Sequence, residues 1–443
     1  MDNNTNDNEE GKKQDDPLYK TKQARNVATM VFLHLLQNFI TMPVRMEILM
    51  PYFNYDTARY STVLNRSLLG TYLMSLILNP LMLELSNIYG RLPVIQFGMY
   101  YSIILKAFSL INPSGNMQIL TSFLSAPGMV TLNSFNVYIS DLYKSSTNNS
   151  KEQADIDSKQ IAVAQSQVMA YKFIGLVVGP VVGGYLSKRN VRLPYVAAIV
   201  AGLIEIYLGQ GLNEYMPIEK RKKQIDYHNL NPLKFLKLFL SGGKLISLSI
   251  MHVLYLITNP RGYGTTEDLV RTVSYGSENF DVMQRSYLKS FSSFVSVLGY
   301  GFGGKILKQI GVAKMFITSS YTLILQRLYQ WLYCKSVSID YILNVINVSK
   351  PLTDVSSNVM LRQEARKQGI KPDELEIMLG NLEEMSLVFS YPCWAIVYGW
   401  CLRSGDVRRF YGVLAGLHVL QNILGLYVLK GGGTRCINEK SNK

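Results

Sequence analysis

Long apolar stretches recur along the whole chain, and they limit what it can fold into more than any other feature of the sequence. A bilayer core about 30 Å thick needs roughly 20 apolar residues in a helix to cross it, and many of these stretches reach that length. Composition agrees, because 48% of the 443 residues are hydrophobic and only 17% are charged, which is unusual for a soluble protein. The sequence therefore predicts an all-α integral membrane protein.

About twelve membrane-spanning helices are expected, arranged as two bundles of six. The weakest of them is 243–258, because it is short and Asn259-Pro260 follows it, and a chain with one span fewer is a competing interpretation. The expected spans are 27–50, 66–86, 93–112, 116–140, 160–185, 192–212, 243–258, 287–307, 313–334, 337–358, 379–402 and 407–429.

These spans divide the chain into an N-terminal bundle, 27–212, and a C-terminal bundle, 243–431. The joint between them, 213–242, is basic and ends in "NPLKFLKLFL", which is typical of a short amphipathic helix whose lysines reach anionic lipid head groups. An ordinary solvated linker is the alternative for the first part of the joint. Residues 1–26 lack the apolar core of a signal peptide, so we expect a disordered cytoplasmic tail there, and a second cytoplasmic tail at 432–443.

The net charge of +14 is spread over short loops. A nucleic-acid partner is not expected, because the basic residues form no stripe interleaved with aromatic side chains. If the N-terminus is cytoplasmic, the basic run "EKRKK" at 219–223 is cytoplasmic too, which agrees with the positive-inside rule. Lys188 and Arg189 fall in an expected outer loop and do not follow the positive-inside rule. We therefore expect both termini in the cytoplasm, with the protein in the plasma membrane or an endomembrane.

Two loops, one in each half, share a pattern. In "NPLMLELSNIYGRLPV", residues 79–94, an apolar stretch ends, the chain turns at Gly90, Arg91 follows, and a new apolar stretch begins. In "GYGFGGKILKQIGVAKMF" the same order appears around Gly311 and Lys314. The two glycines are 311 − 90 = 221 residues apart, about half of the 443-residue chain. This spacing indicates two related six-span halves, which are common in transporters.

The fifth expected span contains a cluster of small residues, "GLVVGPVVGG". Glycines four residues apart allow another helix to approach closely, and a proline inside a helix weakens it at a defined point. Ordinary tight packing is the alternative interpretation. The cluster consists of Gly175, Gly179, Pro180, Gly183 and Gly184.

With these motifs the chain resembles the major facilitator superfamily, nearest to its tetracycline-exporter-like drug/proton antiporter branch. The cluster in the fifth span matches the antiporter pattern G-x-x-x-G-P-x-x-G-G at every fixed position, and Asp141 in "VYISDLY" matches the acid that closes the family's fourth span. In the loop pattern G-x-x-x-D-R-x-G-R-R/K, Gly90 and Arg91 match, while Asn87 replaces the acid. The resemblance implies the two-bundle major facilitator fold, a gating latch at this loop and a gate in the fifth span that limits leak.

The resemblance also implies that spans one, four, seven and ten line a central cavity. Asn133 and Asn136, like Asn344 and Asn347, stand three residues apart and share one helix face. Paired amides suit a neutral or zwitterionic organic solute, and hydrogen bonding between helices is the alternative. The expected substrate pathway is Gln37, Asn38, Asn133, Asn136, Tyr138, His252, Tyr255, Asn344 and Asn347.

Carboxyl groups at bilayer depth are candidates for proton coupling. We expect Glu47 in the first span and Asp354 in the tenth span to carry protons. Charged residues nearer to span ends are expected to reach toward the membrane surface instead. These are Glu84, Lys106, Arg327 and Asp340.

The predicted function is secondary transport of a small organic solute by alternating access, as a proton-coupled exporter. Protons and membrane lipids are the other expected partners, and the protein is expected to be a monomer. We expect no metal and no cofactor, because the cysteines lack ligand spacing, and no enzyme, because no nucleophile with its base or phosphate loop is present. An uncoupled facilitator, or a transporter-like receptor that binds solute without moving it, stays open as an alternative.

Overall fold

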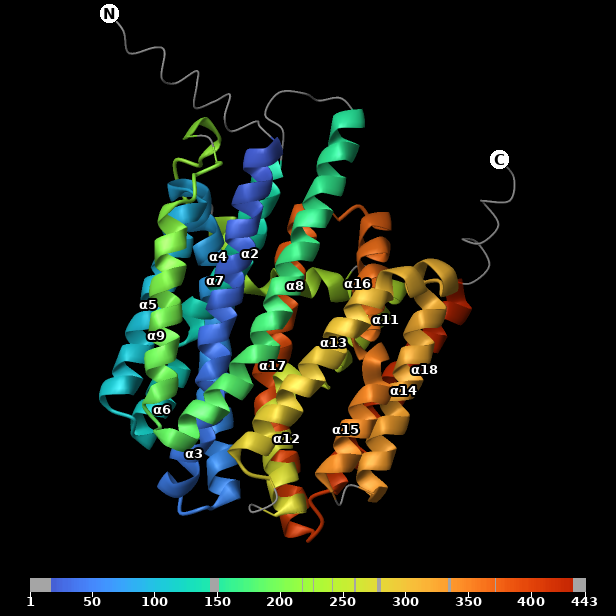
Figure 1. Cartoon of the computed structure of the whole chain (residues 1–443). Coiled ribbons are helices and arrows are strands. Elements are labelled where there is room, and N and C mark those ends of the chain that lie inside the picture. The colour runs from blue at the N-terminus through green and yellow to red at the C-terminus, as the bar shows by residue number, and fades with distance from the viewer. Residues whose placement is uncertain are drawn as a thin grey trace, which may run out of the picture. The chain divides into compact units, whose positions relative to one another are not determined.

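A computed structural model of the chain is built from helices joined by short loops (Figure 1). It describes residues 17–143, 151–216, 218–225, 227–240, 242–258, 260–276, 280–333, 336–370 and 372–432. Within these ranges every regular element is a helix and none is a strand. The prediction of an all-α protein is therefore confirmed.

Close contacts divide the chain into two compact units. Unit 1 contains the residues up to Ile48 together with Leu78–Leu230, and unit 2 contains Leu49–Ile77 together with the residues from Asn231 onward. The boundary after Leu230 falls inside the expected joint, 213–242. The segment Leu49–Ile77 belongs to unit 2, although the sequence places it among the first six spans. Each unit has its own core of buried apolar side chains.

The first half of the chain forms eight helices. Thr41 separates the first two, so the expected first span is two helices in series. The helices are α2 (Pro17–Ile40), α3 (Met42–Tyr52), α4 (Thr57–Tyr89), α5 (Arg91–Ile111), α6 (Gly115–Phe123), α7 (Ala126–Tyr143), α8 (Lys151–Arg189) and α9 (Leu193–Gln210).

The core of unit 1 lies around α2. Val27, Val31 and Leu35 are spaced by four residues, so they share one face of the helix, and all three are buried. They belong to one apolar cluster with Ile95 of α5 and Phe135 of α7. Burial of this face, rather than helix propensity alone, holds α2 in place.

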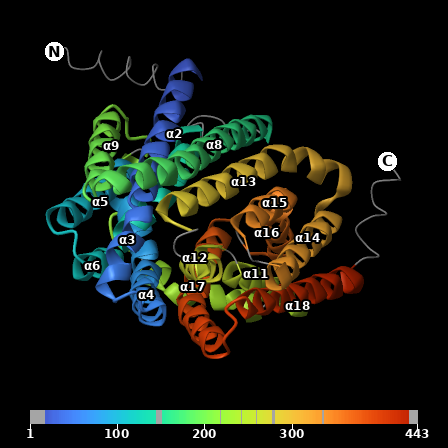
Figure 2. The ribbon, with the colours of Figure 1, turned by 60° about the horizontal axis from the view of Figure 1, so that its bottom comes forward.

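Glycines bring α8 close to α2, and the two helices run alongside each other in Figures 1 and 2. A methyl group added at Gly179 would lie 2.6 Å from Cβ of Phe39, and one added at Gly183 would overlap the carbonyl oxygen of Ile40. Side chains larger than hydrogen would therefore push the helices apart. Pro180 and Gly184 are also buried, and α8 continues through Pro180 without a break.

The joint contains short 3-10 turns, η1 (Ile218–Lys220), η2 (Tyr227–Leu230) and η3 (Pro232–Leu236), followed by a single helical turn, α10 (Lys237–Leu240). The remaining elements belong to unit 2. They are α11 (Gly243–Ile257), α12 (Pro260–Tyr275), α13 (Val282–Ile310), α14 (Val312–Tyr333), α15 (Val337–Ile346), η4 (Asn347–Ser349), α16 (Lys350–Lys367), α17 (Pro372–Arg403) and α18 (Arg409–Gly432).

The core of unit 2 lies where α11 packs against α16 and α18, and where α14 packs against the same two helices (Figure 2). Leu245, Leu248 and Met251 recur every three residues on α11 and are buried in it. The joint contributes Phe235 and Leu238 to this core. The expected amphipathic segment is therefore helical, as η3 and α10, and it buries two apolar side chains in protein. Contact of its lysines with lipid head groups stays a prediction.

Six helices of the described residues are long and apolar enough to cross a membrane. Other expected spans are interrupted: 116–140 is split between α6 and α7, and 337–358 is split by η4. The weak span 243–258 coincides with α11, and α12 continues the helical chain from Pro260. The six are Lys22–Tyr52, Thr57–Tyr89, Arg91–Ile111, Leu193–Gln210, Ile377–Arg403 and Arg409–Leu429.

The first and last described helices extend beyond the expected spans. Helix α2 begins at Pro17, before the expected start of the first span at residue 27, and α18 ends at Gly432. Residues 1–16 and 433–443 lie outside the described part of the chain.

Candidate functional site

The turn between α4 and α5 is built around the guanidinium group of Arg91. Its Nε donates to Oδ2 of Asp141 at 2.8 Å, and its Nη1 donates to Ser86 Oγ at 2.6 Å and to Asn87 Oδ1 at 2.8 Å. Three of the predicted gating residues, Asn87, Arg91 and Asp141, therefore meet in unit 1. Asn87 contributes a hydrogen bond where the family pattern has a charge.

Gly90 and the joint complete this turn. Gly90 has φ = 103°, a left-handed conformation that glycine adopts without strain. Oε2 of Glu214 accepts a hydrogen bond from the backbone N–H of Leu92 at 2.9 Å, which satisfies one of the exposed donors at the start of α5. Lys222 pairs with Glu84 at 2.9 Å. The beginning of the joint is thus tied to the turn by charged groups.

A second cluster lies inside unit 1, between α2 and α9. Nδ1 of His34 is 3.1 Å from Oε1 of Glu205, and both side chains are 0% exposed. Nε2 of His34 lies 3.2 Å from the carbonyl oxygen of Gly128. Gln37 donates from Nε2 to Oε2 of Glu205 at 2.5 Å, while its own carbonyl oxygen is buried and accepts no hydrogen bond.

A buried lysine lies beside this cluster. Lys106 of α5 donates from Nζ to Oδ1 of Asn38 at 2.9 Å and to Oγ of Ser102 at 2.6 Å. The charges of Glu205 and Arg45 both act on it. Two basic residues and one acid therefore share this part of unit 1, together with the imidazole of His34.

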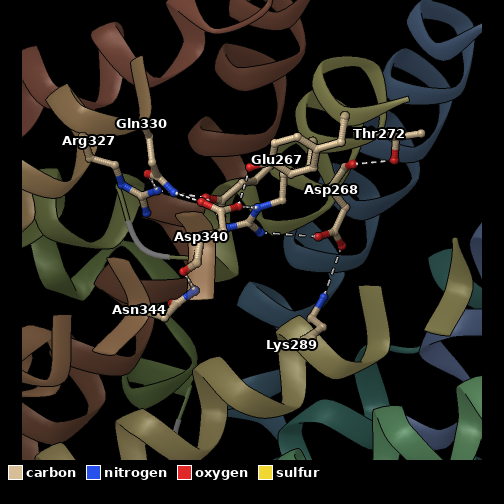
Figure 3. A network of polar contacts seen from close by, with 10 residues as sticks. Glu267, Asp268, Thr272, Lys289, Arg327, Gln330, Asp340 and Asn344 are labelled. Atoms are coloured by element: carbon tan, nitrogen blue, oxygen red, sulfur yellow. Dashed lines mark hydrogen bonds and ion pairs between the residues drawn. The ribbon is translucent and has the colours of Figure 1, made fainter. Parts of the chain in front are cut away.

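Unit 2 contains a larger network of charges, drawn in Figure 3. Nε of Arg271 on α12 lies 2.7 Å from Oδ2 of Asp340 on α15, and Nη2 of Arg271 lies 3.1 Å from Oε1 of Glu267. Arg327 on α14 donates to the same Glu267 oxygen at 2.8 Å. At the edge of the network, Lys289 on α13 pairs with Asp268 at 3.4 Å.

Uncharged groups donate further hydrogen bonds to Asp340. Tyr275 donates its hydroxyl proton to Oδ2 of Asp340, and Gln330 donates from Nε2 to Oδ1, each at 2.8 Å. Asn344 donates to the backbone carbonyl of Asp340 at 2.8 Å. Charges that are paired and hydrogen-bonded in this way persist in a protein interior, where an isolated charge would be very unfavourable.

The predicted pathway residues do not form one group in the described residues. Gln37 and Asn38 belong to the unit 1 cluster, and Asn344 belongs to the unit 2 network. Tyr138 is buried and donates its hydroxyl proton to the carbonyl of Asn213 at 2.7 Å, which fixes the end of α7.

His252 is buried beside Ser357, with Nδ1 to Oγ at 3.3 Å, and stacks on Tyr255 with ring centroids 6.4 Å apart. This is the arrangement of a structural hydrogen bond between α11 and α16. The side chains of Asn133, Asn136 and Asn347 lie outside the described part of the structure. Membership of the nine predicted residues in a substrate pathway stays a prediction.

The two predicted proton carriers have different surroundings. Glu47 on α3 has an exposed side chain. Asp354 on α16 is partly buried, and its carboxylate accepts hydrogen bonds from Tyr300 at 3.4 Å and from Asn358 at 3.0 Å. Their role in proton coupling also stays a prediction.

One expectation is wrong. Glu84, Lys106, Arg327 and Asp340 do not extend away from the protein, because they are only 3%, 8%, 2% and 0% exposed. The physical reason is that each has partners on neighbouring segments, which compensate its burial. Their partners include Lys222, Asn38, Glu267 and Arg271, respectively.

Sequence reasoning also missed Glu205 as a site residue. The signal was present, since Glu205 is the one charged residue in the apolar run "LPYVAAIVAGLIEIYLGQ" of α9, and a lone acid at bilayer depth is usually functional. Its partner His34 is 171 residues away in the chain, so no local pattern connects the two. Among the described residues, no group of three His, Cys, Asp or Glu side chains is placed to hold a metal ion.

Solved structures similar to this chain include two solute transporters. The human organic anion transporter MFSD10 (TETRAN) matches 92% of this chain and 99% of its own, with a TM-score of 0.65 and 14% sequence identity. The nucleoside transporter NupG also matches 92% of this chain and 99% of its own, with a TM-score of 0.68 and 15% sequence identity. A point mutant of NupG has the same coverage and TM-score, at 13% identity.

Sequence comparison adds nothing to this, because no protein-family model and no curated protein matches the chain. At such low identities the structural similarity establishes the fold and leaves the choice of solute open. The similarity extends over nearly all of each transporter and of this chain, so it includes both halves of the chain and not one helix bundle alone. The chain therefore has the major facilitator fold, and it is a multi-pass integral membrane protein.

Proposed function

We propose that the protein is a secondary transporter of the major facilitator superfamily, which moves a small organic solute across a membrane by alternating access. The observation that carries this proposal is the similarity to two different solute transporters over 92% of the chain. An enzymatic role has no comparable support. We further propose that the protein works as a monomer in the plasma membrane or an endomembrane, with both termini in the cytoplasm.

The polar interiors of the two units support a transporter of polar solutes. Ion pairs such as Arg271 with Asp340 are unfavourable to bury, and replacing them by apolar side chains would often stabilise a protein. Intramembrane charges are usually retained for function. Unit 1 contains the cations Arg45 and Lys106, and unit 2 contains Arg271 and Arg327, so both units have groups that suit a solute with acidic or carbonyl oxygens.

Proton-coupled export is the most specific form of the proposal. It is supported by the resemblance to drug/proton antiporters and by the close contact that the glycine face of α8 makes with α2. Gly179 and Gly183 leave no room for a side chain at this contact. Tight packing of these helices would keep a transporter from leaking while it changes state.

Solute counterflow in proteoliposomes tests the proposal. Vesicles with the purified full-length chain are loaded with unlabelled solute, and uptake of trace labelled solute is followed for a nucleoside, an aromatic carboxylate and a lipophilic amine. Transient, saturable accumulation of one class above empty vesicles is the expected result. Counterflow does not depend on proton coupling, so it tests solute transport alone.

A receptor that binds solute without moving it is the second candidate. It is favoured by Asn87, which occupies the position of the family's acid in the turn around Arg91 and provides only a neutral acceptor. Saturable binding to the purified protein without counterflow for the same compound would support the receptor over the transporter.

A further inference from the structure

We propose that His34 and Glu205 together form the proton-binding site of this transporter. The proposal rests on the proposed function, because it names the residues that carry the coupled proton. It assigns the role to a buried pair between α2 and α9 in place of Glu47 and Asp354.

The geometry requires a shared proton. A carbonyl oxygen can only accept a hydrogen bond, so the contact between Nε2 of His34 and Gly128 places one proton on Nε2. Nδ1 then faces Oε1 of Glu205 at 3.1 Å, and a hydrogen bond there needs a second proton. That proton lies either on Nδ1, giving an imidazolium and a carboxylate, or on Oε1, giving a neutral imidazole and a carboxylic acid.

Both arrangements are electrically neutral, so the pair holds one exchangeable proton as a unit. Loss of this proton leaves the lone pair of Nδ1 against a carboxylate at 3.1 Å, which is repulsive. The deprotonated pair carries one negative charge and binds a proton again when water reaches it. Gln37 fixes the other carboxyl oxygen in either state, because its amide donates to Oε2.

Basic groups lie near the pair. Lys106 of α5 interacts electrostatically with Glu205 and with Arg45 of α3. A negative charge left on the pair after loss of the proton would therefore lie near basic side chains. Tyr195, on α9 itself, also interacts electrostatically with Arg45. Helix α8, which packs against α2, carries Lys172.

The two earlier candidates lack this arrangement. Asp354 accepts hydrogen bonds from Tyr300 and Asn358, which are neutral donors and not proton-binding groups of the imidazole kind. Glu47 is exposed. Among the ion pairs of the described residues, His34 with Glu205 is the one that joins a buried acid directly to an imidazole.

An infrared pH titration of the full-length protein in lipid tests the site without any solute. Wild type is compared with Glu205→Gln and His34→Asn, and imidazole and carboxylic-acid bands are followed between about pH 5 and 8, the range in which histidine changes charge. We expect one protonation step that involves both groups and is absent in Glu205→Gln. In His34→Asn we expect the imidazole band of this step to be absent.

The matched control is Glu374→Gln, because Glu374 of unit 2 pairs with Lys237 at 3.2 Å and belongs to neither cluster. This variant must retain the wild-type titration step. Monodisperse elution and an unchanged helix content are required of every variant. A pair that keeps its protonation state over the whole range, as a static ion pair would, overturns the proposal.

Proteoliposomes link the site to transport. In Glu205→Gln we expect proton movement driven by a nucleoside or an aromatic carboxylate to fall by about a hundredfold, as is typical when a proton-transfer group is removed, while counterflow of the same solute persists. Wild-type proton flux in Glu205→Gln would overturn the proposal. Absence of counterflow in the wild type would refute the proposed function, and the titration would still decide whether the pair binds an exchangeable proton.

Discussion

Arg271 on α12 and Asp340 on α15 form an ion pair inside unit 2, with Nε 2.7 Å from Oδ2 and the Asp340 side chain 0% exposed. Tyr275 and Gln330 occupy the remaining acceptor sites of the carboxylate. The pair joins two helices that are far apart in the sequence, and its removal would leave a cation in the interior of the unit. Single substitutions at such buried contacts therefore have measurable effects on stability.

Asp340→Asn is expected to destabilise the protein strongly. Arg271 would lose its closest compensating charge, and breaking a buried pair typically costs about 3–5 kcal/mol. Thermal unfolding in detergent measures the change. The control is Asp406→Asn, which breaks the part-exposed pair of Asp406 with Arg408 and is expected to cost at most about 1 kcal/mol. Equal losses in the two variants would show that Asp340 is not needed to compensate a buried cation.

Gly183→Ala is expected to separate α2 from α8. The added methyl group would overlap the carbonyl oxygen of Ile40, and backbone atoms cannot move aside cheaply. Overpacking typically costs about 1–3 kcal/mol. The matched control is Gly416→Ala in α18, where nothing lies within 4 Å of the new methyl group. There alanine is expected to raise stability slightly, through its better helix propensity.

Thermal unfolding of both alanine variants gives the comparison, and counterflow tests whether the proposed gate at α8 is affected. We expect Gly183→Ala to lower the unfolding temperature and to impair tight sealing, and Gly416→Ala to do neither. A tolerated Gly183→Ala would show that the close approach of the two helices is not required.

Gly90→Ala is expected to be more harmful than Gly311→Ala. Both glycines have positive φ, 103° and 85°, so both substitutions carry backbone strain of about 1–3 kcal/mol. Only at Gly90 would the methyl group also meet a side chain, Oε2 of Glu214 at 2.5 Å, whereas nothing lies within 4 Å at Gly311.

The difference in unfolding midpoint between these two variants therefore isolates the contact of Gly90 with the joint. Glu214→Gln in the Gly90→Ala background should reduce the difference, because it removes the charge that holds the carboxyl group at the start of α5. If the two glycine variants unfold at the same temperature, the tie between turn and joint is not important for stability.

Asn87→Asp is expected to stabilise the turn. Oδ1 of Asn87 accepts from Nη1 of Arg91 at 2.8 Å, and a carboxylate in the same place would make a charge-assisted bond, roughly twice as strong as a neutral one. It would also restore the acid of the family pattern. A higher unfolding midpoint that disappears in the double variant Asn87→Asp, Arg91→Gln is the expected result. An unchanged midpoint would mean that Asp141 alone satisfies Arg91.

The fold was predictable from the sequence because its signals are local. Apolar stretches predict the helices, and the glycines at 90 and 311, which both adopt positive φ immediately before a new helix, mark equivalent turns in the two halves. The glycine pattern of α8 predicts a close helix contact, which the structure confirms against α2. Helix ends were less predictable, since polar residues inside α15, η4 and α16 do not reveal where the helix is interrupted.

The buried clusters were only partly predictable, because their partners are far apart in the chain. The sequence indicates Gln37 and Asn38 as polar residues of the first span, but Glu205 and Lys106, which they bind, lie on α9 and α5. It predicts Lys106 and Asp340 at the membrane surface, since a charge near a span end usually extends there. Only the packing of separate helices shows that each has compensating groups within the protein.

Solute-driven proton movement in proteoliposomes of the wild type tests proton-coupled transport most directly, with a pH-sensitive dye inside the vesicles and counterflow of the same solute recorded in parallel. We predict that one solute class produces both counterflow and an opposite flux of protons. Saturable solute binding with neither flux would contradict this prediction and would identify the protein as a receptor.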